Sequence, residues 1–334
     1  MKPETASKSG NKSLSREAIF FMILLAIQFG VQPGLTRRYT PNDVCKSSVI
    51  LVAESIKFFL AFSMLFVSGN TKSALGGWTI YSWISVAGVP AVLYAVQNFA
   101  ALIAYQNLDG LTFNVLNQTK TLSAALCCYL VMGRRQSNMQ IVALILLLLS
   151  ALVLEGIIKM DFFVDHTTAS KMELSFDPKH FSHGVAPCLL ASFISGLAGA
   201  LSQKNLQGAG SRNPYLFSME LCAFSVISLG LSLMASPDGQ MIREKGFLHG
   251  WTPMTLVPIV TNSIGGILVG LVTKYAGAVR KGFGLIFGLF ISGLIQGRET
   301  GVSPEQITGG LLAGISLWMH ATNPAVPTKK TKKD

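Results

Sequence analysis

Charged side chains interrupt several long apolar stretches of this sequence: Glu54, Lys57, Lys120, Glu155 and Glu220. A charge near the centre of a bilayer costs about 2.5–3.5 kcal/mol on insertion scales, so each of them needs a partner, a ligand or water. Glu54 and Lys57 share one helix face and are expected to neutralise each other, although a carrier could share that lysine with a bound anion. Glu155 and Lys159 are four residues apart, which is typical of an interfacial ion pair.

Lys120 belongs to a polar insert in an otherwise apolar segment and has no acidic residue three or four positions away. A lysine is a compact point charge that suits a phosphate, and the neighbouring amides of Asn114 and Gln118 can bind a nucleobase edge or ribose hydroxyls. Two hypotheses stay open. Either Lys120 pairs with a glutamate of another helix, Glu54 or Glu220, or it binds a phosphorylated ligand.

For two further groups of polar side chains, the sequence is compatible with either a structural role or ligand binding. Tyr94, Gln97 and Asn98 occupy positions i, i+3 and i+4 and therefore share one helix face, but amide bonds between membrane helices are common. Lys274 and Lys281 lie near predicted helix ends, where cations usually extend to the headgroups. Lys281, however, precedes glycines that allow close helix approach.

Composition and hydropathy indicate an integral membrane protein. Of the 334 residues, 50% are hydrophobic and 13% are charged, where soluble proteins carry about 25% charged residues. The mean hydropathy is +0.48. Apolar stretches of about 18 or more residues recur along the chain, and a spanning helix needs roughly 20. Continuous apolar runs such as 141–154 favour helices over alternating membrane strands.

The apolar stretches predict an all-α fold of ten transmembrane helices in two sets of five. Because the first set has an odd number of helices, the second set starts on the opposite face of the membrane. We therefore expect the two sets to be inverted repeats. The repeats cover 18–158 and 183–322, with a mixed-charge linker at 159–182, an N-terminal tail at 1–17 and a C-terminal tail at 323–334. The predicted spans are 18–35, 45–67, 83–107, 111–132, 138–158, 183–204, 213–235, 252–273, 280–297 and 304–321.

The basic residues predict the orientation of the chain. Sixteen of the 27 Lys and Arg residues lie on the side of the N-terminus, nine lie on the other side, and Lys57 and Lys120 lie within spans. Because cytosolic loops carry the excess of Lys and Arg, both termini are expected in the cytosol. The formal net charge of +11 therefore reflects topology and contact with anionic lipid, and it does not indicate nucleic-acid binding.

Cysteine and histidine positions favour neither a disulfide framework nor a metal site. Four of the five cysteines, Cys127, Cys128, Cys188 and Cys222, lie in apolar segments, which is typical of small buried side chains. No spacing fits zinc, so no metal and no cofactor are predicted. A membrane glycosyltransferase would need catalytic carboxylates with a metal or large polar loops, and the sequence offers neither. We expect no enzymatic activity.

Three motifs carry a resemblance to a known family: Pro90-x3-Tyr94-Ala95-x-Gln97-Asn98, then Asn107-Leu108-Asp109, then Gln118-Thr119-Lys120. Together they resemble the nucleotide-sugar transporters, especially the branch for CMP-sialic acid, UDP-galactose and UDP-N-acetylglucosamine. Further matches are Glu54-Ser55-Ile56-Lys57, Lys274-Tyr275 and Lys281-Gly282-Phe283. The resemblance covers roughly residues 20 to 320.

The resemblance implies a drug/metabolite-transporter fold that exchanges a cytosolic nucleotide sugar for a lumenal nucleoside monophosphate. By the same resemblance, Lys120 and Lys274 contact phosphate and Tyr94 and Asn98 line the nucleotide pocket. Two departures are visible. Phe113-Asn114 replaces the usual Tyr-Gln, and 213–220 lacks the usual Arg-Asn-x-Gln. The site residues expected to bind substrate are Glu54, Lys57, Tyr94, Gln97, Asn98, Phe113, Asn114, Gln118, Lys120, Lys274 and Lys281.

The C-terminus resembles a targeting signal. Lys330 and Lys332 occupy the fifth and third positions from the end, like the dilysine signal that coat machinery reads to retrieve membrane proteins to the endoplasmic reticulum. A basic tail of this kind is also a common orientation signal. We expect transport of UDP-N-acetylglucosamine or UDP-N-acetylgalactosamine in exchange for UMP, with CMP-sialic acid, UDP-galactose, another phosphorylated metabolite or a non-transporting scaffold as alternatives. Besides substrate, lipid and coat, a second copy in a homodimer is an expected partner.

Overall fold

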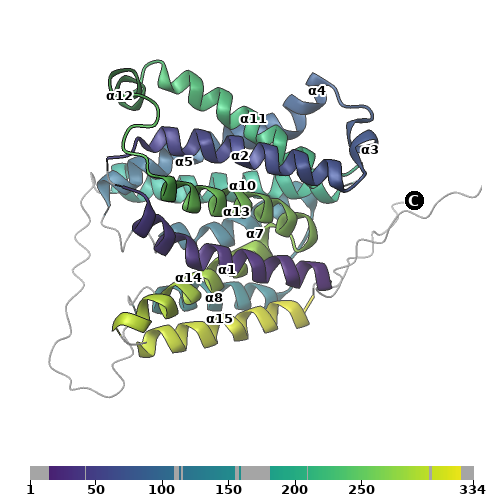
Figure 1. Cartoon of the computed structure of the whole chain (residues 1–334). Coiled ribbons are helices and arrows are strands. Elements are labelled where there is room, and N and C mark those ends of the chain that lie inside the picture. The colour runs from purple at the N-terminus through teal and green to yellow at the C-terminus, as the bar shows by residue number, and fades with distance from the viewer. Residues whose placement is uncertain are drawn as a thin grey trace, which may run out of the picture.

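The computed structural model describes residues 15–41, 43–108, 113, 116–154, 158, 181–208, 210–300 and 303–324. In these ranges the ordered elements are all helical, and the long helices run parallel or antiparallel to one another (Figure 1). Its elements are α1 (Arg16–Tyr39), α2 (Lys46–Val67), α3 (Thr71–Leu75), α4 (Ile80–Trp83), η1 (Ile84–Gly88), α5 (Val89–Asn107), α7 (Lys120–Met132), α8 (Asn138–Leu154), η2 (Phe181–Val185), α10 (Ala186–Gln207), α11 (Pro214–Leu233), α12 (Pro237–Lys245), η3 (Pro253–Thr255), α13 (Leu256–Tyr275), α14 (Ala278–Thr300) and α15 (Pro304–Thr322).

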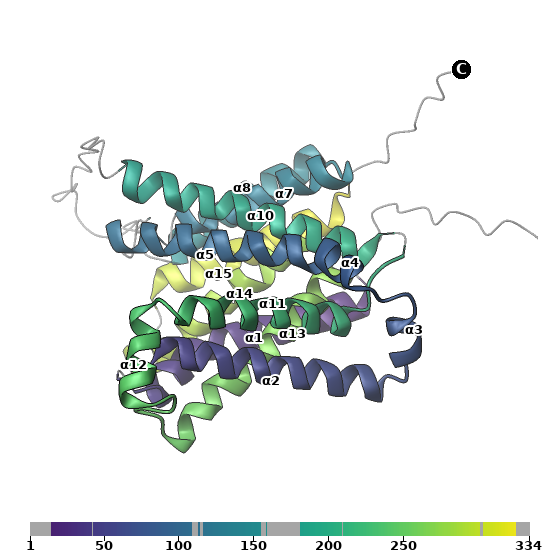
Figure 2. The same ribbon diagram turned by 90° about the horizontal axis from the view of Figure 1, so that it is seen from above.

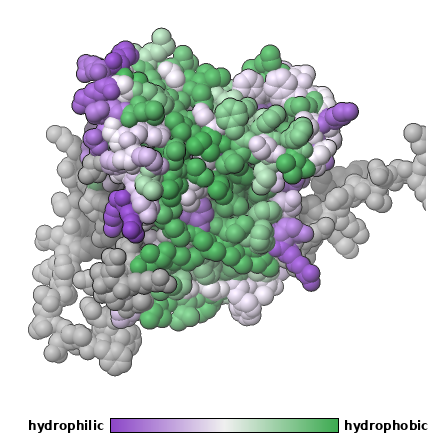
Figure 3. Space-filling model, viewed as in Figure 1, coloured by the Kyte–Doolittle hydropathy of each residue, from purple (hydrophilic) through white to green (hydrophobic). Residues whose placement is uncertain are grey.

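Seven helical segments in the described ranges are long and apolar enough to cross a membrane: Arg16–Tyr39, Lys46–Val67, Ile80–Asn107, Phe181–Gln207, Pro214–Leu233, Pro253–Tyr275 and Ala278–Ile295. α8 is a shorter apolar helix. Hydrophobic side chains cover the middle of the molecule, whereas hydrophilic ones gather mainly toward its two ends (Figure 3). The chain is therefore a multi-pass membrane protein, and the count of ten crossing helices remains a prediction.

The two ends of the bundle are distinguished by the loops they carry. The end where α1 begins and α15 finishes also carries α3 and α4, and we call it the terminal end (Figure 1). There the hydroxyl of Ser137, which lies between α7 and α8, donates to the carbonyl of Asn323 at 2.7 Å. The other end, where α12 lies, is called the opposite end.

Several helices start at side chains that accept a hydrogen bond from their first turn. Ser15 and Asn213 cap α1 and α11, and Ser303 forms a reciprocal capping box with Gln306 at the start of α15. The same chemistry starts α12 at Pro237, because Ser236 caps that helix and proline suits its first position.

The fourth predicted span differs at its start. It was predicted over 111–132; residues 116–118 are helical, a turn interrupts the helix at Thr119, and α7 begins at Lys120. The hydroxyl of Thr119 donates to the carbonyl of Leu116 at 2.6 Å, so the side chain competes for a backbone acceptor of the preceding turn. Lys120 therefore lies at a helix start and not inside a continuous helix.

Helices of the two halves pack against each other in a reciprocal pattern. α1 packs on α13 and α14, and α10 correspondingly packs on α5 and α7. α2 pairs with α11 (Figure 2), and α8 pairs with α15 (Figure 1). Serine hydroxyls join the last pair, because Ser150 donates to the carbonyl of Gly309 at 2.9 Å and Ser316 donates to that of Ala143 at 2.5 Å.

Small residues let the helices of the two halves approach closely. Gly196 of α10 lies so near α7 that an added Cβ would meet the Ser123 carbonyl carbon at 2.6 Å and the Ala124 nitrogen at 2.7 Å. Both atoms belong to the backbone, so neither can rotate away. Membrane helices gain their packing energy from such close contacts, and α10 depends on this glycine for its position.

Gly196→Ala is therefore expected to destabilise the protein by about 1–3 kcal/mol, because the extra methyl group forces α10 and α7 apart. Gly230→Ala is the matched control, since no atom of the described residues lies within 4 Å of its added Cβ. That substitution gains helix propensity and should be neutral or stabilising by up to about 1 kcal/mol. Thermal unfolding in detergent measures both effects. Equal melting temperatures for the two variants would contradict the close approach.

Candidate functional site

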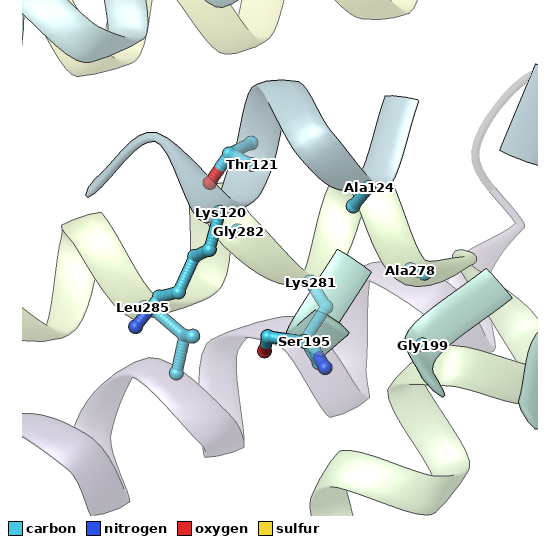
Figure 4. Close-up of a pocket in the computed structure, with 9 residues that line it drawn as sticks. All are labelled: Lys120, Thr121, Ala124, Ser195, Gly199, Ala278, Lys281, Gly282 and Leu285. Carbon is cyan, nitrogen blue, oxygen red and sulfur yellow. The ribbon is translucent and has the colours of Figure 1, made fainter. Parts of the chain in front are cut away.

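A cavity lies inside the bundle where α7, α10 and α14 meet. Its volume is about 100 Å³, and its walls are Lys120, Thr121, Ala124, Ser195, Gly199, Ala278, Lys281, Gly282 and Leu285 (Figure 4). Two of these side chains are cationic, and they come from different halves of the chain. Among the described residues, none of those lining the cavity is acidic. The cavity is therefore positively charged.

Small residues make the space that the two lysines occupy. Gly199 and Ala124 line the cavity on α10 and α7, and Gly282 follows Lys281 directly on α14. An added Cβ at Gly282 would meet the Thr121 hydroxyl oxygen at 2.6 Å, so α14 reaches α7 only because this position has no side chain. Close approach of these two helices brings Lys120 and Lys281 to one cavity.

The two glutamates considered as partners of Lys120 have other partners in the structure. Glu54 accepts a hydrogen bond from Lys57 at 2.6 Å, as the spacing predicts, and Glu220 pairs with Arg212. Both glutamates proposed as partners of Lys120 are therefore engaged elsewhere. Within the described ranges Lys120 has no ionic or hydrogen-bonding partner, so its ammonium group is available to an anion.

The Glu54–Lys57 pair lies away from the cavity lining, on the face of α2 toward α13. An added Cβ at Gly266 of α13 would meet the Lys57 side chain at Cδ, and 3.3 Å separates it from Nζ. The second carboxylate oxygen of Glu54 is buried and has no hydrogen-bond partner among the residues that the structure describes. The pair is thus half-buried between helices and keeps one unsatisfied acceptor.

Tyr94, Gln97 and Asn98 share one face of α5, as predicted. The amide of Gln97 donates to the side-chain oxygen of Asn98 at 3.3 Å, and neither residue lines the Lys120 cavity. Asn98 is exposed and Tyr94 is partly buried. The three side chains therefore form a separate polar surface on α5.

Gln118 and Phe113 lie on the chain just before Lys120. Gln118 lines a neighbouring recess that also contains Thr121, which connects it to the cavity wall. Phe113 instead packs edge-on against Tyr105, with ring centroids 5.3 Å apart, and its carbonyl accepts from the thiol of Cys188. Asn114 lies outside the described residues, as do Lys330, Lys332, Glu155 and Lys159.

Lys274 lies at the end of α13 and not on the cavity wall. Its ammonium nitrogen is 5.5 Å from the centre of the Tyr275 ring, so the ring faces the charge. Tyr275 in turn stacks on Phe21 of α1, with centroids 5.4 Å apart. Lys274 and Lys281 thus flank the short turn that joins α13 to α14, but only Lys281 reaches the cavity.

Sequence reasoning missed Ser195 and Thr121, whose hydroxyls line the cavity beside the lysines. Ser195 belongs to a run of small residues in α10, where a hydroxyl is an ordinary helix–helix contact, so no signal singled it out. The prediction for the cysteines is confirmed, because all five are free and buried.

The arrangement suits an anion. Two ammonium groups, two hydroxyls and the absence of a carboxylate on the cavity wall match the charge and acceptor oxygens of a phosphate. The volume is smaller than the roughly 300–1,000 Å³ of pockets that hold whole ligands. The cavity as it stands therefore fits the phosphate part of a larger molecule.

Comparisons with known proteins agree on one family. The family model for nucleotide-sugar transporters matches residues 12–299. The UDP-N-acetylglucosamine transporter ROCK1 of Arabidopsis thaliana is 36% identical over 98% of this chain and 99% of its own length. The UDP-galactose translocator of Homo sapiens is 27% identical over 83% of this chain and 70% of its own length.

A solved crystal structure shares the fold, with a TM-score of 0.63 at 14% identity over 92% of this chain and 98% of that one. The relatives are transporters and not enzymes, which confirms the expectation of no enzymatic activity. The family match spans most of the chain and includes the cavity and both of its lysines. The chain belongs to the nucleotide-sugar transporter family.

Proposed function

We propose that this transporter carries UDP-N-acetylglucosamine or UDP-N-acetylgalactosamine from the cytosol into the lumen of the endoplasmic reticulum or Golgi in exchange for UMP. The observation that carries the proposal is the cavity that Lys120 and Lys281 share, because it offers two cations and no carboxylate to a diphosphate. The similarity to a UDP-N-acetylglucosamine transporter, 36% identical over 98% of this chain, supports the choice of sugar. The UDP-galactose translocators among the relatives make UDP-galactose the alternative substrate.

Strict exchange follows from the uncompensated charge. Closing the empty cavity is costly, because its two lysines have no ion-pair partner among the described residues and would lose their hydration. A nucleotide sugar or a nucleoside monophosphate brings the phosphate that offsets this cost. The carrier therefore changes sides with either anion bound and returns only slowly when empty.

Alternating access between two inverted five-helix repeats is the proposed mechanism, and the helix pairing supports it. The packing of α1 on α13 and α14 has its counterpart in the packing of α10 on α5 and α7. A bundle with such reciprocal contacts can open at either end by exchanging equivalent interfaces. Lys120 and Lys281 begin or nearly begin the corresponding helices α7 and α14, so substrate lies where the two repeats meet.

The proposed topology places both termini, and with them the terminal end, in the cytosol, where most Lys and Arg residues lie. Lys330 and Lys332 of the C-terminal tail would then be accessible to the coat machinery that returns proteins to the endoplasmic reticulum. Tyr94, Gln97, Asn98 and Gln118 are proposed to contact the nucleoside.

Uptake into proteoliposomes tests the exchange. In vesicles preloaded with UMP, we expect uptake of UDP-N-acetylglucosamine and UDP-N-acetylgalactosamine at least about tenfold above vesicles without nucleotide, because only the loaded carrier returns. Preference for CMP-loaded vesicles with CMP-sialic acid would overturn the choice of base. Faster uptake of UDP-galactose than of both N-acetylhexosamines would favour the alternative substrate, and equal uptake without counter-nucleotide would contradict exchange.

A further inference from the structure

Two glutamines near the end of α10 tie this helix to the turn between α13 and α14. The side-chain oxygen of Gln203 accepts from the backbone nitrogen of Ala278 at 2.8 Å, and its amide donates to Gln207 at 2.9 Å. The amide of Gln207 donates to the carbonyls of Thr273, at 2.9 Å, and of Lys274, at 2.5 Å. These bonds join the end of α10 to the end of α13 and to the first residue of α14.

The turn that the glutamines bind has a lysine on each flank. Lys274 precedes it and Lys281 follows it, and Lys281 reaches the cavity. Gly277 forms the turn with a φ of 95°, a conformation that favours glycine. A Cβ at this glycine would lie 2.9 Å from the Gln203 amide nitrogen, so the turn fits closely against the glutamine. The pair therefore holds the turn at the terminal end.

The same spacing occurs in α1. Gln28, Gln32 and Arg37 have the spacing of Gln203, Gln207 and Arg212 in and after α10. The bond within the pair is also repeated, because Gln28 donates to Gln32 at 3.2 Å. These two residues lie in the half of α1 near the opposite end, since α1 begins at the terminal end. The chain thus carries one glutamine pair toward each end of the bundle.

The two pairs differ in what they bind across the bundle. The amide of Gln32 reaches one carbonyl of another helix, that of Pro258 at the start of α13, at 3.0 Å. Gln207 reaches two carbonyls at the end of α13. Pro258 in α13 corresponds to Pro90 in α5, since each follows a valine near the start of its helix. By that correspondence, the carbonyls that match Thr273 and Lys274 belong to Tyr105 and Gln106.

We propose that Gln203–Gln207 and Gln28–Gln32 are alternate latches that close the two ends of the substrate path in turn. In this structure Gln207 closes the terminal end, and Gln32 is held open on the Pro258 carbonyl. In the other state Gln32 binds the carbonyls of Tyr105 and Gln106, and Gln207 moves to that of Pro90. The proposal rests on the proposed transport function and deepens it by naming the residues that set its two states.

Gln32 and Gln207 each donate to more carbonyls of other helices when their own end of the bundle is closed. This difference stabilises both states of the transporter. Gln207 has two carbonyl acceptors here and one in the other state, while Gln32 has one here and two there. Opening one end and closing the other therefore conserves the number of these amide-to-carbonyl bonds. A bound anion at Lys120 and Lys281 then needs to supply only a small bias.

Thiol labelling of a cavity residue tests the latches. Ser195→Cys places a reporter on the cavity wall, and the five native cysteines are buried, so the unsubstituted chain gives the background. In sealed microsomes, a charged thiol reagent added outside reaches the reporter only through the cytosolic end. Gln207→Met keeps the length of the side chain but neither donates nor accepts. It should raise the labelling rate about fivefold, the factor of one net hydrogen bond.

Gln32→Met is the matched variant. It should lower the labelling rate by a similar factor, because it removes more hydrogen bonds from the state with an open terminal end than from the state seen here. The double variant should return toward the rate of the reporter alone, which misfolding would not do. Opposite shifts from the two single variants support the latches. No shift, or shifts in the same direction, overturns them.

The labelling result separates this inference from the function it rests on. Labelling needs no transported substrate, so the latches can be supported while every nucleotide sugar in the uptake panel fails, which would reject only the proposed function. Conversely, uptake of the expected UDP-sugars together with unchanged labelling in both variants would reject only the latches.

Discussion

Replacing Lys120 with alanine is expected to reduce kcat/KM for UDP-N-acetylglucosamine by about 30-fold or more. Loss of one partner from a buried, charge-assisted contact costs about 2–5 kcal/mol, and each 1.4 kcal/mol corresponds to a factor of ten. Within the described residues, Lys120 has no ionic partner that could be stranded by the change, so the loss falls on the ligand. Uptake into UMP-loaded proteoliposomes measures the effect.

Lys204→Ala is the matched control for Lys120. Lys204 lies exposed in the last turn of α10 and does not line the cavity, so its removal changes the net charge equally and should alter uptake less than twofold. Lys120→Arg keeps the charge but changes its shape, and we expect intermediate uptake. If Lys120→Ala transports as fast as the Lys204 variant, the cavity is not the phosphate site and a scaffold role gains weight.

The second large effect concerns stability and a group of residues outside the cavity. Glu220 of α11 is 4% exposed and pairs with Arg212 through two hydrogen bonds, one of them at 3.2 Å. The indole nitrogen of Trp78 donates to the same carboxylate at 2.9 Å, and that of Trp83 donates to the Glu220 carbonyl at 3.2 Å. This network fastens the segment before α5 to the start of α11.

Glu220→Ala is expected to lower the melting temperature by roughly 5–10 °C, because breaking a buried pair leaves a guanidinium uncompensated at a cost of about 3–5 kcal/mol. Glu244→Ala, at an exposed position of α12, should change it by less than about 1 °C. Thermal unfolding in detergent compares the two.

A double variant, Glu220→Ala with Arg212→Met, identifies the cause of that loss. If the stranded charge is responsible, the double variant recovers much of the stability, since an apolar replacement of both partners is often neutral. A double variant as unstable as Glu220→Ala alone would assign the loss to the Trp78 contact. The network would then act through its indole bond and not through charge.

Local chemistry in the sequence was enough to predict much of this protein. Long apolar stretches require helices in a bilayer, because every backbone group needs a partner there, and this alone determined the all-helical, multi-pass class. The Glu54–Lys57 pair followed in the same way from a spacing of three, which places both side chains on one face. The motifs around Tyr94 and Lys120 were specific enough to indicate the family that the comparisons then established.

Contacts between distant segments were decided only by the tertiary structure. From the sequence, the partner of Lys120 could be either of two glutamates or a ligand. Periodicity shows which residues share a face of one helix, but it does not show which helices contact each other. In the structure Glu220 forms an ion pair with Arg212. The close approach of α14 to α7 at Gly282 places Lys281 in the same cavity as Lys120. The repeated glutamine spacing of α1 and α10 was likewise present in the sequence, but its meaning appeared only when the structure showed the two pairs bound to opposite ends of α13.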